Sequence, residues 1–170
     1  MSPKGSHDRG SHDITRPVSS QVTVLHPGDV ACGERGERFE TLLGSCVAIV
    51  LTDPRRTLGA MCHVVHSSPA PAAHQDDSAW GDAALRKVYS LLQGRGIDPR
   101  QCEAWVYGGG NMFPERFSGP HVGQYNAQWA LDTLQAEGIR VIDADLGGAH
   151  YRKLAWSVGA QPPQVVCVPV

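Results

Sequence analysis

Two residues of this 170-residue chain have the types and spacing for covalent catalysis: Cys46 and, seventeen positions later, His63. A cysteine attacks as its thiolate, but a free thiol with a pKa of about 8.5 is only a few per cent ionised at neutral pH. A nearby imidazolium can lower that pKa by about two units, which makes the thiolate the main species. If the two side chains meet, they form a nucleophile and its activating base.

The segments around these residues predict that they do meet. Cys46 begins "CVAIVLTD" and His63 lies in "LGAMCHVVH", two runs rich in β-branched and apolar residues that are joined by "DPRRT". Such runs around a turn predict an antiparallel hairpin. A turn centred between residues 54 and 55 would make Cys46 and His63 cross-strand neighbours. Gly44 and Ser45 would supply exposed backbone N–H groups for an oxyanion hole.

Two other interpretations of these residues stay open. A cysteine and a histidine on adjacent strands are more often core residues than catalytic ones. Cys62, His63 and His66 could suggest a zinc site, but neighbouring residues of a strand point to opposite faces, which disfavours it. The cysteine count is odd and contains no CxxC pair, so we expect reduced thiols, buried in the case of Cys62, Cys102 and Cys167.

The rest of the chain predicts one folded domain. Residues 1 to 20 repeat "GSHD" without apolar periodicity and are expected to be a disordered leader, while residues 21 to 170 form the domain. We expect helices within residues 77–96 and 122–138 and strands within residues 21–26, 46–53, 58–66, 101–108, 139–145, 152–158 and 164–170. This order predicts a single-domain α/β sandwich with a mixed, mainly antiparallel sheet and two main helices on one face.

Composition excludes several classes of protein. The net charge of −2 gives no basic footprint for nucleic acid. The longest aliphatic run is five residues, 47 to 51, far below the ~20 that span a bilayer. We therefore expect a soluble, cytoplasmic protein without membrane insertion.

The glycine-rich stretch "YGGGNMF" could be mistaken for a phosphate loop. It lacks the Lys-Ser/Thr pair of a P-loop and the spacing of GxGxxG, so a structural turn is preferred. Phe113 would either cap the core or form an exposed apolar tip beside the active site. Asn111 and Asn126 are interpreted as turn or cap residues.

Five segments occur along the chain in the order "TLLGSCVAIVLTDP", "GAMCHVV", "GGGNMF", "VGQYN" and "DADLGG". In this order and spacing they resemble the chemoreceptor glutamine deamidase family, CheD, and the resemblance covers residues 21 to 160. It implies a protein-glutamine deamidase that uses a cysteine thioester, with no metal or organic cofactor, on a fold similar to the catalytic domain of the cytotoxic necrotizing toxins. The implied partners are methyl-accepting chemotaxis receptors and, in some systems, a CheC-type phosphatase.

The family's site consists of a cysteine, a histidine and a threonine. The first two carry over to Cys46 and His63. The family's threonine lies six residues before the cysteine, where this chain has Glu40, and Thr41 is five before it. We take Thr41 as the third member, since a hydroxyl can orient the imidazole.

Two hypotheses from other classes compete with the deamidase. The chain could be a chemotaxis adaptor that binds receptors and a CheC-type phosphatase with little catalysis of its own. A cysteine peptidase or transglutaminase would use the same nucleophile.

Overall fold

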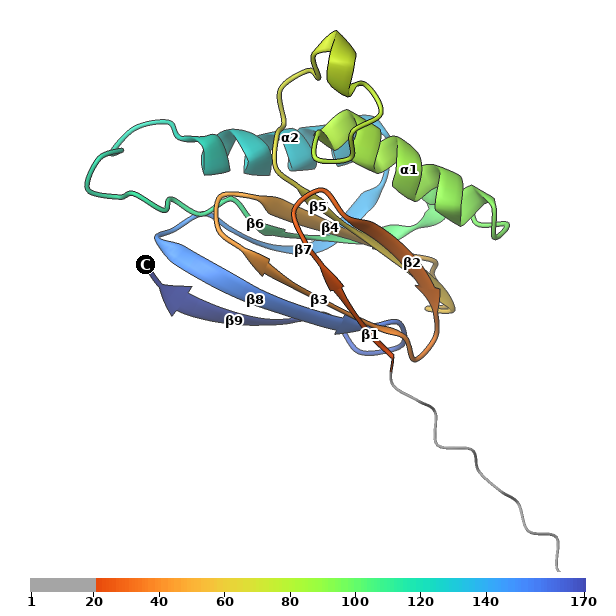
Figure 1. The fold of residues 1–170 in the computed structure, drawn as a ribbon. Helices are drawn as coiled ribbons and strands as arrows, with labels where there is room; N and C mark the ends of the chain where they lie inside the picture. The colour runs from red at the N-terminus through yellow and green to blue at the C-terminus, as the bar shows by residue number, and fades with distance from the viewer. Residues whose placement is uncertain (1–20) are drawn as a thin grey trace, which may run out of the picture.

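The computed structural model describes residues 21 to 170, which fold into three layers (Figure 1). Two helices cover one face of a five-stranded sheet, and a four-stranded sheet covers its other face. The α/β class and the two helices on one face are therefore confirmed. The expected leader, residues 1 to 20, lies outside the described residues.

The five-stranded sheet is mixed and mainly antiparallel. In spatial order it contains β2 (Val30–Glu34), β5 (Leu58–Val64), β4 (Val47–Thr52), β6 (Glu103–Gly108) and β7 (Arg140–Leu146). The β6–β7 pair is parallel and the other pairs are antiparallel. All six residues of β4 are buried because the sheet is covered on both faces, which explains its unbroken apolar sequence.

The four-stranded sheet contains β1 (Val22–Leu25), β3 (Arg38–Leu43), β8 (His150–Ser157) and β9 (Gln164–Pro169), in that order. Phe39, Thr41 and Leu43 of β3 are buried, while the residues between them are more exposed. This period of two is typical of a strand with one face on the core. The sheet thus closes a second core, built around Trp105 and Trp156, between the two sheets.

The expectation of one sheet was wrong, and β2 and β3 were not predicted. Their sequences, "VACGE" and "RFETLL", contain glycine and charged residues in place of a long apolar run. Without β3 the chain offers no partner for β1 and no strand that joins β1 to the β8–β9 pair. The second sheet therefore could not be deduced from the strands that were recognised.

The helices agree with the expected pattern. α1 (Gly81–Gln93) buries Ala84, Leu85, Val88 and Leu92 on the five-stranded sheet, as its spacing predicts, but Leu91, which was expected on the same face, is 37% exposed. α2 (Val122–Ala136) buries Ala130 and Leu134 as expected, and also Gly123 and Asn126, which were not expected. Short 3₁₀ helices occupy Ala72–His74 and Pro99–Gln101.

Among residues 21 to 170, no helix is both long and apolar enough to cross a bilayer. The same residues contain five free cysteines. Cys62 and Cys102 are buried as predicted, but Cys167 is exposed because it lies on the edge strand β9.

Candidate active site

The candidate nucleophile lies where the chain changes sheets. Residues 44 to 46 connect β3 of the four-stranded sheet to β4 of the five-stranded sheet without a longer loop. Cys46 is half-buried and packs against the core between the sheets. Its position is therefore fixed by both sheets at once.

The expected hairpin is present, but its register differs from the predicted one. His63 was expected opposite Cys46 and lies opposite Ala48. Val47 pairs with Val64 and Ala48 with His63, so His63 lies opposite the residue two positions after Cys46 and is a diagonal neighbour of Cys46. The cause is the turn, which is centred between residues 55 and 56. There Asp53 accepts hydrogen bonds from Thr57 N at 2.7 Å and Leu58 N at 3.0 Å, and Arg56 has a φ of 58°.

The diagonal relation still places the Cys46 and His63 side chains on the same face of the hairpin. Cys46 precedes Ala48 by two residues, and side chains two apart on an extended chain point to the same face. Both side chains therefore face the layer between the sheets, and diagonal neighbours lie about 7 Å apart, within reach of long side chains.

His63 is held firmly in place. It is only 2% exposed. Its backbone N–H donates to the Asp29 carbonyl at 3.1 Å, and its carbonyl accepts from Gly28 N at 2.9 Å. These bonds attach β5 to the turn between β1 and β2.

Thr41 determines which nitrogen of the neutral His63 ring carries the hydrogen. Its hydroxyl donates to the Leu25 carbonyl at 2.7 Å and lies 2.8 Å from His63 Nδ1. A hydroxyl has one hydrogen, so an oxygen that donates to Leu25 must accept from Nδ1–H. Nε2 is then the ring nitrogen with a free lone pair, as a general base requires.

Glu40, the other candidate for the third position, points away from the site. It is partly exposed and pairs with Arg38 at 2.8 Å on the outer face of the four-stranded sheet. The alternation along β3 explains this, because adjacent residues of a strand face opposite sides. The structure brings Thr41, and not Glu40, to His63.

The charge states of the pair differ from the expected thiolate and imidazolium. Burial lowers the pKa of His63 to about 4, against the opposing pull of the Asp29 carboxylate. Burial also raises the pKa of the Cys46 thiol, although its own backbone N–H lowers it in part. At neutral pH the resting pair is therefore a neutral thiol beside a neutral imidazole, and the proton has to move during attack.

Residues 44 to 46, which carry the candidate nucleophile, are called the nucleophile turn. Each of their three carbonyl oxygens accepts a hydrogen bond. Gly110 N donates to Gly44 O at 2.9 Å, Gly109 N donates to Cys46 O at 2.9 Å, and the Asn126 side chain donates to Ser45 O at 3.0 Å. By contrast, the N–H groups of Ser45 and Cys46 donate to no other residue between 21 and 170. The turn thus presents free N–H groups, as expected for an oxyanion hole.

Asn126 was interpreted as a turn or cap residue, but it is buried within α2. It is 1% exposed, and its Nδ2 also donates to Val65 O at 3.1 Å. Its acceptors lie 81 and 61 positions away in the chain. The one local signal is its place in α2, three residues after Gly123 and therefore on the same face.

Glycines allow α2 to reach the nucleophile turn. A Cβ atom on Gly123 would lie 2.4 Å from the Gly110 carbonyl oxygen and 2.6 Å from that of Gly109. Backbone therefore packs directly on backbone between the start of α2 and the loop after β6. This explains the glycines of "GGGNMF" and "VGQYN" as structural, which agrees with the predicted turn.

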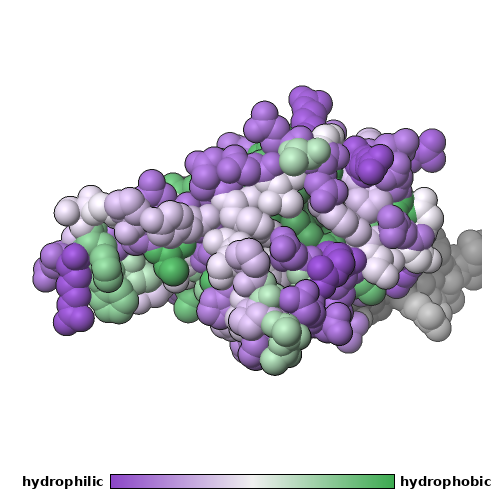
Figure 2. All heavy atoms as spheres, turned by 90° about the horizontal axis from the view of Figure 1, so that it is seen from above, coloured by the Kyte–Doolittle hydropathy of each residue, from purple (hydrophilic) through white to green (hydrophobic). Residues whose placement is uncertain are grey.

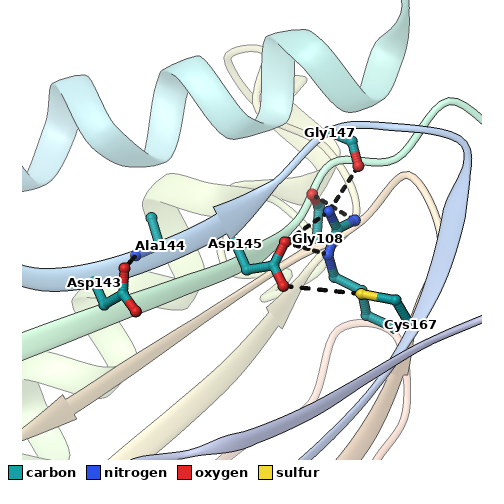
Figure 3. A network of polar contacts seen from close by, with 7 residues as sticks. Gly108, Asp143, Ala144, Asp145, Gly147 and Cys167 are labelled. Atoms are coloured by element: carbon teal, nitrogen blue, oxygen red, sulfur yellow. Dashed lines mark hydrogen bonds and ion pairs between the residues drawn. The ribbon is translucent and has the colours of Figure 1, made fainter.

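A buried arginine supports the end of β6 beside this loop. Arg152, 2% exposed, donates to Gly147 O at 2.7 Å, to Gly108 O at 3.3 Å and to Asp145 at 3.0 Å (Figure 3). The Cys167 thiol lies 3.8 Å from the other Asp145 oxygen. The network joins β8 to the residue that precedes Gly109, whose N–H binds Cys46 O.

An apolar surface adjoins the site. Phe113 and Tyr125 are each 60% exposed, so Phe113 forms a tip and does not cap the core. A pocket of about 420 Å³ extends from Ser45 and Gly110 to these side chains. Seen from the helix side, hydrophobic side chains gather at the left end of the molecule, where the loop between β6 and α2 lies (Figure 2).

In the part of the chain that the structure describes, no three His, Cys, Asp or Glu side chains are grouped closely enough to hold a metal ion. Cys62 and His63 alternate between the two cores, as the strand geometry requires.

Comparisons with a family model and with named relatives both point to the CheD family. A family model described as "CheD chemotactic sensory transduction" matches residues 66–161. This match begins after His63, so it does not itself include the candidate residues.

Relatives with assigned names match more of the chain. The probable chemoreceptor glutamine deamidase CheD 2 of Albidiferax ferrireducens is 36% identical over 138 residues, which are 79% of this chain and 80% of that protein. The probable chemoreceptor glutamine deamidase CheD of Pseudomonas fluorescens is 31% identical over 148 residues, 85% of this chain and 84% of the relative. Because the first match leaves out only about a fifth of the chain, it includes residues 41 to 63.

Among solved structures, a Neisseria meningitidis protein of family DUF152 is 12% identical. The match has a TM-score of 0.43 and covers 77% of this chain and 65% of that one. This similarity is too low to support an argument.

Proposed function

The chain belongs to the CheD family, and we propose that it is a chemoreceptor glutamine deamidase in which Cys46 is the nucleophile. Its relatives carry the name of that activity. The observation that supports the proposal best is the bonded series from the Leu25 carbonyl through Thr41 to His63 Nδ1. A buried histidine held in one tautomer on the same face as a half-buried cysteine has the arrangement of a nucleophile and its base.

The first half of the reaction forms a thioester. His63 Nε2 takes the proton of Cys46 while the sulfur attacks the carboxamide carbon of a receptor glutamine. The oxyanion that results is stabilised by the N–H groups of Cys46 and Ser45. His63 then gives its proton to the nitrogen, ammonia leaves, and a γ-glutamyl thioester on Cys46 remains.

The second half hydrolyses the thioester. His63 takes a proton from water, whose oxygen attacks the thioester carbon. The carbon–sulfur bond breaks, His63 returns a proton to Cys46, and the receptor carries glutamate. Thr41 keeps Nε2 as the basic ring nitrogen in both halves. Because Cys46, His63 and water carry out every step, the proposed reaction uses neither a metal nor an organic cofactor.

The proposal extends to the substrate surface. The apolar pocket that begins at Ser45 and includes Phe113 and Tyr125 lies where a receptor segment would have to pass to bring a glutamine to Cys46. A CheC-type phosphatase is proposed as a second partner for the same side. The likeness of the domain to the cytotoxic necrotizing toxin catalytic domain is also an expectation from the family.

The direct test uses a purified cytoplasmic fragment of a chemotaxis receptor. It is incubated with the wild type and with Cys46→Ala, and its intact mass is measured. Each deamidation adds about one dalton, because an amide becomes a carboxylic acid. We expect the gain with the wild type alone, together with ammonia release and without cleavage or cross-linking.

Other results would separate the competing hypotheses. A fragment that binds but gains no mass would favour the adaptor. Cleavage products or cross-linked species would indicate a peptidase or a transglutaminase. Cys167→Ala serves as the matched control, because it removes an exposed thiol on β9 and should leave the mass gain unchanged.

A further inference from the structure

The peptide between Ser45 and Cys46 is held by the side chain of one residue that lies 81 positions away in the sequence. Of the three carbonyls in the nucleophile turn, those of Gly44 and Cys46 bind backbone N–H groups of the loop after β6, but that of Ser45 binds the side chain of Asn126. Asn126 is on α2, a separate element of the other layer. The turn therefore depends on a single residue for the orientation of its central peptide.

That orientation decides where the Cys46 N–H points. In a trans peptide the carbonyl and the following N–H point in opposite directions. With the Ser45 oxygen bound toward α2, the Cys46 N–H is directed away from the helix, and it donates to no other residue between 21 and 170. A turn free to rotate this peptide would lose the N–H from the site.

Asn126 has no freedom to release the peptide. An amide nitrogen has two hydrogens, and both are used, by Ser45 O at 3.0 Å and by Val65 O at 3.1 Å. Val65 follows Val64, the last residue of β5 that pairs with β4. The side chain is 1% exposed, so water does not compete for its hydrogens.

His63 does not depend on this contact. Its backbone is bonded to Asp29 and Gly28 in the turn between β1 and β2, and its ring to Thr41 of the four-stranded sheet, whereas the Asn126 amide bonds Ser45 and Val65. Loss of the Asn126 amide should therefore change the oxyanion donor while the thiol and its base stay in place.

Resting on the proposed deamidase function, we propose that Asn126 is a positioning residue, which holds the Ser45–Cys46 peptide so that its N–H faces the oxyanion of the reaction. It touches neither substrate nor sulfur and acts through the peptide. Removing one donor from an oxyanion hole lowers kcat by about 100- to 1000-fold.

The test compares Asn126→Asp and Asn126→Ala with the wild type in the receptor-fragment assay. Asp has the shape of Asn but offers oxygen in place of the two donated hydrogens. Gln128→Ala is the matched control, because it removes an exposed side-chain amide of α2 whose one hydrogen bond among residues 21 to 170 is to Asp132. Unfolding midpoints show which variants are folded.

A second measurement separates positioning from general damage. Alkylation of Cys46 by iodoacetamide needs the thiol and its base but no oxyanion donor. We expect kcat to fall about 100-fold in both Asn126 variants, with KM and the alkylation rate within about twofold of the wild type. Gln128→Ala should match the wild type throughout.

Two results would overturn the inference. One is a folded Asn126 variant with wild-type kcat. The other is a parallel fall of kcat, alkylation rate and unfolding midpoint, which would indicate a purely structural role. If the wild type itself does not deamidate the fragment, the proposed function fails. If the wild type is active and either of these two results is seen, only the inference about Asn126 fails, so the two failures are distinguishable.

Discussion

The neutral thiol and imidazole of the resting site set the order of events at the residue scale. Because the pKa of His63 is lowered to about 4 and that of Cys46 is raised, no ion pair forms before substrate arrives. His63 is unprotonated at neutral pH and ready to act as a base, provided that its free lone pair is on Nε2. Thr41 is the residue that meets this condition.

Removing the Thr41 hydroxyl should therefore slow the reaction without unfolding the protein. Thr41→Val keeps the shape but removes the hydroxyl that accepts from Nδ1–H, so this bond no longer holds the ring in one tautomer. We expect kcat to fall roughly 100-fold, the lower part of the range that a positioned base contributes. Thr41→Ser keeps the hydroxyl and should stay within a few-fold of the wild type. Equal rates for all three proteins, measured as ammonia release, would show that the hydroxyl does not orient His63.

Sequence reasoning reached part of this site. The spacing of Cys46 and His63 and the hairpin between them were predicted, but the register was wrong because the bonds of Asp53 that shape the turn have no sequence signature. The choice between Glu40 and Thr41 required β3 to be recognised, since only its alternation separates them. The contacts of Asn126, which was interpreted as a turn or cap residue, could not be predicted, because its partners Ser45 and Val65 lie 81 and 61 positions away in the chain.

At the scale of elements, the approach of α2 to the nucleophile turn is the main requirement. This approach depends on Gly123, because the backbone of Gly109 and Gly110 leaves no room for a side chain at position 123. A helical glycine is otherwise unfavourable, so its replacement by alanine would normally stabilise the helix by up to about 1 kcal/mol.

Gly123→Ala tests this contact. The new Cβ would overlap backbone oxygens, so α2 must shift away and Asn126 must leave Ser45. We expect a fall in deamidation of about tenfold or more, as for other small misplacements of catalytic groups. Gly119→Ala is the control, because nothing lies within 4 Å of its added Cβ. Full activity in Gly123→Ala would show that this packing does not position the site.

The elements also show where prediction from sequence ends. Long apolar or strongly periodic segments such as β4 and α1 were recognised from composition alone. β2 and β3 were not, because their stability comes from partners distant in sequence: β5 for β2, and β1 and β8 for β3. This is why one sheet was expected where the chain forms two.

For the molecule as a whole, burial of His63 between the sheets makes stability depend on pH. The folded pKa of about 4 lies below the ordinary value of 6.5, so the unfolded chain binds a proton in this range that the folded one does not. Stability is therefore fully present above pH 6.5 and decreases as the pH falls from 6.5 to 4. The shift corresponds to roughly 3 kcal/mol.

The comparison with His63→Asn isolates this contribution. Asn cannot be protonated, and its amide can still donate to Thr41. Denaturant unfolding should show that the wild type loses about 3 kcal/mol more than the variant between pH 6.5 and 4. Parallel profiles for the two proteins would mean that His63 is not buried as a neutral group.

The most direct test of the central claim traps the intermediate. Receptor fragment and wild-type protein are incubated with hydroxylamine, which attacks a γ-glutamyl thioester to give a hydroxamate and free Cys46. We predict hydroxamate at the glutamines that otherwise become glutamate, and none with Cys46→Ala. Glutamate that still forms with Cys46→Ala would contradict a cysteine nucleophile, and glutamate without hydroxamate in the wild type would contradict the thioester.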